Sequence, residues 1–270
     1  MHRSSLFWGS ALILLSGLFL LKATGILQDD VLGYFWPLLL LLIGVWVLAS
    51  AFLPRDTFVE EGEAFAIDLQ GASEAKVEFN HGAGQIEIRA GAPSGQLMTG
   101  TKALGMDVSS RVGAAHKLVG GILEAEVNAG PTFVPFIGPS GGAWRFDLNR
   151  DIPLTLEVSA GASNVSLDLS DLLVKYLSLE TGASSVRLTL PSRTESTFVE
   201  IEAGAANLEI SVPEGVAARI RIKEGMTALN IDRARFPNLE RGIYQSANYH
   251  QAAHRAELNI EAGAASVNIQ

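Results

Sequence analysis

The stretch Val77-Glu78-Phe79-Asn80-His81-Gly82-Ala83-Gly84-Gln85-Ile86-Glu87-Ile88 decides the fold, because alternating apolar residues stand on both sides of a Gly-Ala pair. The Gly-Ala pair returns with its glycine at positions 161, 182, 204 and 263, and in the altered form Gly-Met at position 225. The glycines at 161, 182, 204 and 225 are 21, 22 and 21 residues apart. A fixed period of that size predicts a fold of stacked repeats.

Within each repeat, alternation of apolar and polar residues predicts strands with one buried and one wet face. A second corner recurs at Ser170-Asp171, Pro191-Ser192 and Pro213-Glu214. We therefore predict an all-β, right-handed β-solenoid over residues 65–270. Its last strand, residues 264–270, is expected at an open end of the stack, where its edge would accept a partner strand. The predicted turn glycines, which we expect to supply positive φ at the corners, are Gly82, Gly161, Gly182, Gly204, Gly225 and Gly263.

Residues 1–54 contain two uncharged apolar stretches, each long enough for about 20 residues of membrane-spanning helix. We predict a transmembrane helical hairpin with helices at about 5–22 and 36–53, followed by a linker over 55–64. Gly9, Gly17 and Gly44 are candidate helix-packing residues, because small side chains let membrane helices approach closely. The first stretch would alternatively be a cleaved signal peptide, although Lys22 follows it directly and no A-x-A site is present.

These spans predict a multi-pass protein of the plasma membrane. Arg3 and Arg55 flank one side and Lys22 the other, so the positive-inside bias slightly favours a cytoplasmic solenoid.

Charge and composition exclude several classes of function. The net charge is −9, and residues 1–54 sum to zero, so the acidic body disfavours binding to nucleic acid. The chain has no cysteine, which excludes disulfides, thiolate nucleophiles and cysteine zinc sites.

Candidate chemical sites are weak. Ser140 lies in a G-x-S-x-G pattern but among loop residues without the strand-to-helix turn that a hydrolase needs. His250 and His254 have the spacing of a zinc helix, but Gln251 stands where the zinc-protease motif has glutamate. An acidic row is expected on the solvent face, where it would serve solubility or bind calcium or polysaccharide; its members are Asp168, Glu180, Glu200, Glu202 and Glu209. We predict no enzymatic activity, no catalytic residue, no cofactor and no metal site.

Two segments interrupt the period, residues 104–142 and 232–256. The first contains an apolar loop whose candidate partner contacts are Phe133, Val134, Phe136 and Ile137. Both segments would either cap the ends of the stack or form a docking site.

The helical hairpin resembles the LiaI/LiaF-like transmembrane region of bacterial envelope-stress proteins, through Leu6-Phe7-Trp8-Gly9 and Trp36-Pro37-Leu38 with Leu41-Leu42-Ile43-Gly44. The body resembles the toast-rack β-solenoid of LiaF-type cell-wall-active antibiotic response proteins, through residues 77–88, 144–148, 151–154, 167–172 and 179–184. The resemblance implies a non-enzymatic bacterial membrane protein. Some relatives modulate a sensor histidine kinase, although several such regulators have more spans than the two expected here.

Three functions follow as hypotheses. The first is a regulator or sensor accessory of the envelope stress response that acts by protein–protein contact, with a sensor histidine kinase or another membrane protein as partner. The second is a self-associating structural scaffold at the membrane, and the third a glycan binder on the outer face. The bilayer is an expected partner in all three.

Overall fold

The computed structural model describes Ser16, Lys22, Thr24, Leu38 and residues 63–102, 106–113, 121–129, 133–134, 138–139, 143–223 and 226–270. Ser16, Lys22 and Leu38 have helical backbone. No helix within the described residues has the length and apolarity to cross a membrane. The candidate helix-packing glycines Gly9, Gly17 and Gly44 lie outside the described residues, as do Phe136, Ile137, Ser140 and Gly225.

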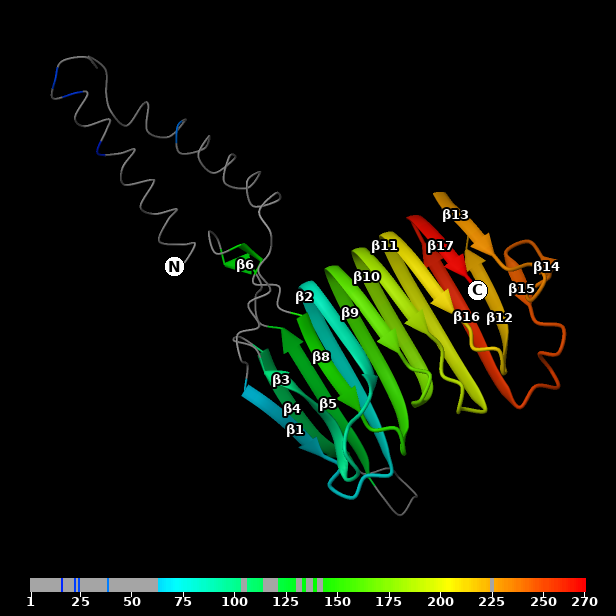
Figure 1. The fold of residues 1–270 in the computed structure, drawn as a ribbon, viewed down its shortest axis with the longest axis horizontal. Coiled ribbons are helices and arrows are strands. Elements are labelled where there is room, and N and C mark those ends of the chain that lie inside the picture. The colour runs from blue at the N-terminus through cyan, green and yellow to red at the C-terminus, as the bar shows by residue number, and fades with distance from the viewer. Residues whose placement is uncertain are drawn as a thin grey trace. The chain divides into compact units, whose positions relative to one another are not determined.

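From residue 63 onward, where β6 and β7 form a separate two-stranded sheet, the described residues are mostly in β-strands (Figure 1). They are β1 (Glu63–Asp68), β2 (Glu74–Ala90), β3 (Gln96–Lys102), β4 (Met106–Gly113), β5 (Ile122–Ala129), β6 (Phe133–Val134), β7 (Gly138–Pro139), β8 (Ala143–Leu148), β9 (Pro153–Asp168), β10 (Leu173–Thr189), β11 (Ser196–Ser211), β12 (Val216–Lys223), β13 (Met226–Ile231), β14 (Asn238–Glu240), β15 (Ile243–Gln245), β16 (His254–Ala262) and β17 (Ala264–Ile269).

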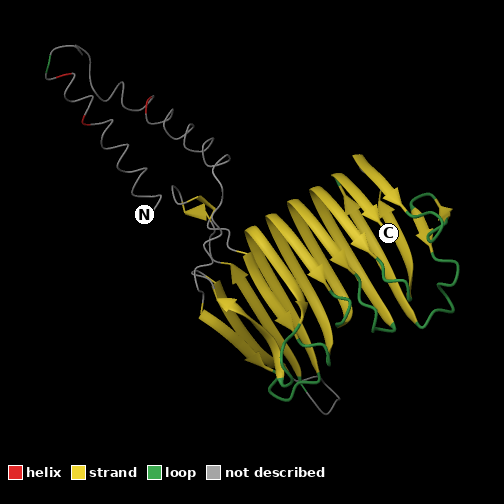
Figure 2. Ribbon diagram, viewed as in Figure 1, coloured by secondary structure: helices red, strands yellow, loops and turns green. Residues whose placement is uncertain are grey.

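The long strands β2, β9, β10 and β11 each form one coil of the predicted stack. In β9, residues 154, 156, 158 and 160 are buried before the Gly-Ala pair, and residues 163, 165 and 167 after it. The buried set therefore changes from even to odd positions at Gly161-Ala162, so the strand bends there and both halves face one core. Figure 2 shows the connecting loops gathered along the edge of the stack opposite these bends. The prediction of a stacked, all-β solenoid is confirmed; its right-handedness stays a prediction.

Neighbouring coils pair in parallel and in register. Leu179 of β10 lies opposite Val158 of β9 and Ile201 of β11, which stacks like side chains into continuous apolar rows. The interior of these rows is dry, with Leu156, Leu177 and Val199 fully buried. Because one coil alone cannot cover its apolar face, stacking supplies the stability of the body.

The order of the stack differs from the order of the chain. The last repeat, β16 and β17, lies between β11 and the preceding repeat, β12 and β13 (Figure 1). The prediction that residues 264–270 form an open edge is therefore wrong, because β17 pairs with β11 on one side and β13 on the other. The 22 residues from 232 to 253 are long enough to let the chain cross one coil and return into the stack.

Both interrupting segments contribute strands to the ends of the stack. From the first, β4 pairs with β5, and β5 pairs with the first half of β2. β8, which follows this segment, pairs with the second half of β2. From the second segment, β14 and β15 extend the sheet beyond β12. The capping interpretation is confirmed for these strands.

Candidate functional site

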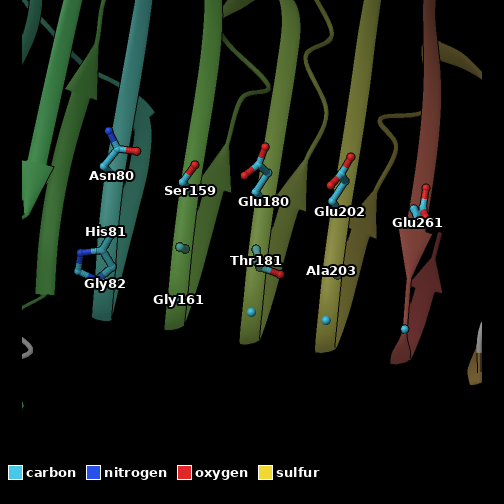
Figure 3. A pocket seen from close by; sticks show the side chains of 14 residues that line it. Asn80, His81, Gly82, Ser159, Gly161, Glu180, Thr181, Glu202, Ala203 and Glu261 are labelled. Carbon is cyan, nitrogen blue, oxygen red and sulfur yellow. The ribbon is translucent and has the colours of Figure 1, made fainter.

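A shallow groove of about 770 Å³ crosses the coils beside the Gly-Ala bends (Figure 3). Its lining repeats along β2, β9, β10 and β11 as an outward polar residue, an inward residue and then glycine, and β16 contributes Glu261 and Gly263. The outward residues are Asn80 on β2, Ser159 on β9, Glu180 on β10, Glu202 on β11 and Glu261 on β16. In-register pairing lines them up, with Glu180 opposite Ser159 and Glu202, and Glu202 opposite Glu261. We call these five residues the polar row.

Glycines form the floor of the groove, at the next outward position of each strand. A Cβ atom on Gly161 would lie 2.4 Å from the carbonyl oxygen of Gly82, and one on Gly182 would lie 3.1 Å from that of Gly161. The corresponding distance is 3.0 Å for Gly204 and 3.2 Å for Gly263. Each bend therefore needs glycine because the backbone of the neighbouring coil approaches it closely. We call these glycines, with Gly82, the glycine ladder.

The predicted reason for these glycines is wrong, although the structure does place them at the bends. The described glycines with positive φ are Gly71, Gly84, Gly95 and Gly242, none of which belongs to the glycine ladder. The strand bends with ordinary backbone angles, so close packing between coils and not left-handed geometry excludes a side chain here.

The polar row is acidic over three neighbouring coils. Neither Glu180 nor Glu202 has an ion pair or side-chain hydrogen bond among the described residues. Glu261 accepts a hydrogen bond from Lys223 at 2.6 Å, and this contact raises the pKa of Lys223, with smaller contributions from Glu202 and Glu200. Parallel strands lie about 4.8 Å apart, so the carboxylates of the row repel one another, and Lys223 is paired with Glu261 alone, which leaves an excess of negative charge above the glycine floor.

The acidic row predicted from sequence is split between the two faces of the body. Glu180, Glu200 and Glu202 lie before the bends, whereas Asp168 and Glu209 lie after them, on the opposite layer. Glu200 accepts a hydrogen bond from the Tyr176 hydroxyl at 3.1 Å, and Glu209 pairs with Arg187 at 3.2 Å. The prediction missed Glu261. The phrase Glu-x-Gly-Ala, which occurs at residues 180, 202 and 261, is the signal that identifies the true row.

A buried histidine stands at the end of the groove. His81 is 4% exposed, and neither ring nitrogen has a hydrogen-bond partner among the described residues. Its ring meets that of Trp144 edge-on, with the centroids 4.7 Å apart. Burial lowers the pKa of His81, so the ring is neutral at pH 7.

The structure separates the other chemical candidates. His250 is exposed in a turn against Tyr249, whereas His254 begins β16 and its Nδ1 lies 3.0 Å from the carbonyl oxygen of Thr194. The two histidines share no helix. Across the described part of the chain, no group of three or more His, Asp or Glu residues is arranged to hold a metal ion. Phe133 and Val134 form β6, which pairs with β7.

Comparison with known proteins finds a matching family model for the N-terminal segment and another for the β-stranded body. The family model described as the N-terminal domain of toast_rack, DUF2154, matches residues 57–211. The model described as the LiaI-LiaF-like transmembrane region matches residues 6–48. Among solved structures, a candidate cell adhesion protein from Clostridium sporogenes is similar, with a TM-score of 0.66 and 24% identity over 77% of this chain and 97% of that one. None of the curated proteins compared with the chain matches it.

Proposed function

Because the chain belongs to the toast-rack family and carries a LiaI-LiaF-like transmembrane region, we propose that it is a non-catalytic regulator of the bacterial envelope stress response that acts by protein–protein contact. Both family models support a membrane protein of the envelope stress response family. The regulatory role would be exercised on another membrane protein, and a sensor histidine kinase is the partner class that the family resemblance implies.

The observation that carries the proposal is the groove. Its floor is free of side chains, and its carboxylates at Glu180 and Glu202 form no ion pair among the described residues. An extended cationic segment of a partner would fit this surface, because lysine or arginine side chains would neutralise adjacent carboxylates while the backbone lies close over glycine. A conventional catalytic pocket would instead enclose converging polar groups, which this open groove does not do.

The experiment is purification of the tagged full-length protein from native membranes, followed by identification of the proteins that accompany it. We expect a partner whose recovery falls at least fivefold in the Glu180→Gln/Glu202→Gln double variant. Glu209→Gln is the matched control, because this carboxylate lies on the opposite layer and pairs with Arg187. Equal recovery with all variants would exclude the groove as the contact. Loss after substitution of Gly9, Gly17 or Gly44 would move the contact into the predicted membrane helices.

We propose further that the solenoid body, which follows residue 62, faces the cytoplasm. Arg3 and Arg55 flank that side of the predicted spans and Lys22 the other, and positive residues are enriched on the cytoplasmic side. The absence of cysteine from the sequence makes this testable with one engineered thiol. Ser185, exposed on β10, is a suitable position. In intact cells, Ser185→Cys should resist a membrane-impermeant maleimide and react only after lysis. Labelling in intact cells would place the body outside.

A further inference from the structure

The edge strand β13 differs from the other edge strands of the sheet in carrying no charged residue. The pairing order ends at four edge strands: β1 and β4 at one end, β13 and β14 at the other. At the second end, β15 and β14 cover the outer side of β12, while β13 pairs with β17 alone. The outer N–H and C=O groups of β13 thus have no strand beside them among the described residues.

The chemistry of β13 distinguishes it from the other edges. β1 contains Glu63 and Asp68, β4 contains Asp107 and Arg111, and β14 ends at Glu240. β13 has the sequence Met-Thr-Ala-Leu-Asn-Ile, with no charge and no proline, and pairs with β17 without any shift in register. Proteins usually protect an exposed edge with charge, proline or a bulge. β13 has none of these three, which is the pattern of an edge that is meant to pair.

The charge distribution indicates what pairs with it. Residues 212–270 hold seven Lys or Arg and six Asp or Glu, a net charge of +1. The chain as a whole carries −9, so the remaining residues carry −10. A second copy of the chain is therefore repelled by most of the body and least repelled at this end. Identical uncharged edges also meet without opposing like charges.

From these observations we propose that β13 pairs antiparallel with β13 of a second copy, joining two solenoid bodies across a two-fold axis. The side chains fix the register. Ile231 is buried and Leu229 packs on the core, whereas Ala228 and Asn230 face outward. An antiparallel pair keeps the inner face continuous only if inward residues oppose inward residues. Leu229 then lies opposite Leu229 of the second copy, and Ala228 opposite its Asn230.

This dimer does not depend on the groove, and the two proposals fail independently. Asn230 already donates a hydrogen bond from Nδ2 to Oδ1 of Asn268, 3.0 Å away, along the outer face. The proposed pair extends the outer face of polar side chains across the axis and places the Leu229 pair over a continuous core.

The test uses the natural absence of cysteine. Leu229→Cys in the full-length chain, purified in mild detergent and oxidised gently, should give a disulfide dimer, since directly opposed residues bring their Cβ atoms within about 5 Å. Ser185→Cys, exposed in the middle of the stack, is the control. We expect at least five times more cross-linked dimer from Leu229→Cys, and an additional Ala228→Lys substitution should reduce it at least fivefold by charging the edge.

A second pair of variants guards against misfolding at Leu229. When Ala228→Cys and Asn230→Cys chains with different tags are mixed, the cross-link should join the two tags, because these positions oppose each other. Sedimentation of the unmodified protein should show a dimer, and that of Ala228→Lys a monomer. Cross-linking no greater than in the control, a ladder of larger species, or a disulfide to a different protein would each overturn the proposal.

Discussion

Replacing Gly161 by alanine measures how tightly the coils are stacked. The new Cβ would lie 2.4 Å from the carbonyl oxygen of Gly82, and real Cβ atoms essentially never approach closer than 3.0 Å. The two coils must therefore separate by at least 0.6 Å at this point, the difference between those distances. The obstacle is backbone, which cannot rotate aside as a side chain would.

The expected loss follows from that displacement. Overpacking costs about 1–3 kcal/mol, and a weakened ladder hydrogen bond adds about 1 kcal/mol. Alanine recovers about 0.5–1 kcal/mol through the lower entropy of its unfolded chain. We therefore expect Gly161→Ala to lower the free energy of unfolding by about 1–3.5 kcal/mol, which is about 2–14 °C in melting temperature for a domain of this size.

Alanine substitutions along the glycine ladder should lower the free energy of unfolding by amounts that follow the Cβ-to-oxygen distances. Gly182 and Gly204, at 3.1 and 3.0 Å, should lose less than Gly161, and Gly263, at 3.2 Å, should lose least. Gly215 is the control, because its Cβ would meet nothing within 4 Å and its φ is not positive; alanine there should be neutral or slightly stabilising. Urea unfolding followed by circular dichroism measures all five. Equal losses at Gly161 and Gly263, or at Gly161 and Gly215, would refute the close-packing argument.

Three further predictions concern charge, burial and the cap. Glu202→Gln should raise stability by about 0.2–1 kcal/mol by relieving repulsion within the polar row, an effect that high salt should reduce; Glu209→Gln, which breaks an ion pair, should give no gain in the same unfolding assay. Burial lowers the pKa of His81, so the unfolded chain binds the proton first and stability should fall as the pH drops below about 6.5; His81→Phe should flatten this slope, and parallel slopes would contradict it. Gly242→Ala should loosen the β14–β15 turn, because Gly242 has a φ of +75° and its Cβ would lie 2.6 Å from the carbonyl oxygen of Ile222; faster amide exchange at Ile243 and Tyr244 would report it, and unchanged exchange would count against it.

The period in the sequence predicts which residues share a coil, because burial alternates along each strand and the Gly-Ala pairs mark the bends. It does not predict the order in which coils stack. Leu258 and Ile260 resemble the residues of every other coil, so their pattern alone fits any position. Leu258 and Ile260 pair with Val199 and Ile201 because the long connection after Ile231 brings β16 back beside β11. The path of that connection depends on tertiary packing.

The sequence predicts only part of the polar row, because its pattern does not give the order in which the coils stack. Outward residues at one position of each coil become neighbours only when the coils are in register and adjacent. Glu180 and Glu202 come from consecutive repeats, so their proximity follows from the period. Glu261 joins them only because its coil enters the stack beside β11. The prediction that Asp168 and Glu209 belong to the same row is wrong, because both follow the bend and lie on the opposite layer.

The threading of β16 and β17 between β11 and β12–β13 has a consequence for biosynthesis. A ribosome releases β12 and β13 before the strands that must separate them from β11. The coils therefore cannot stack in the order in which they are synthesised. The coil of β12 and β13 can be added only after β16 and β17 have been made. A premature stop codon after residue 253 would remove the coil of β16 and β17, and β12 and β13 would then lack the strands that join them to β11. Proteases in the cell would then meet a nascent body in which residues 216–270 become resistant together and late.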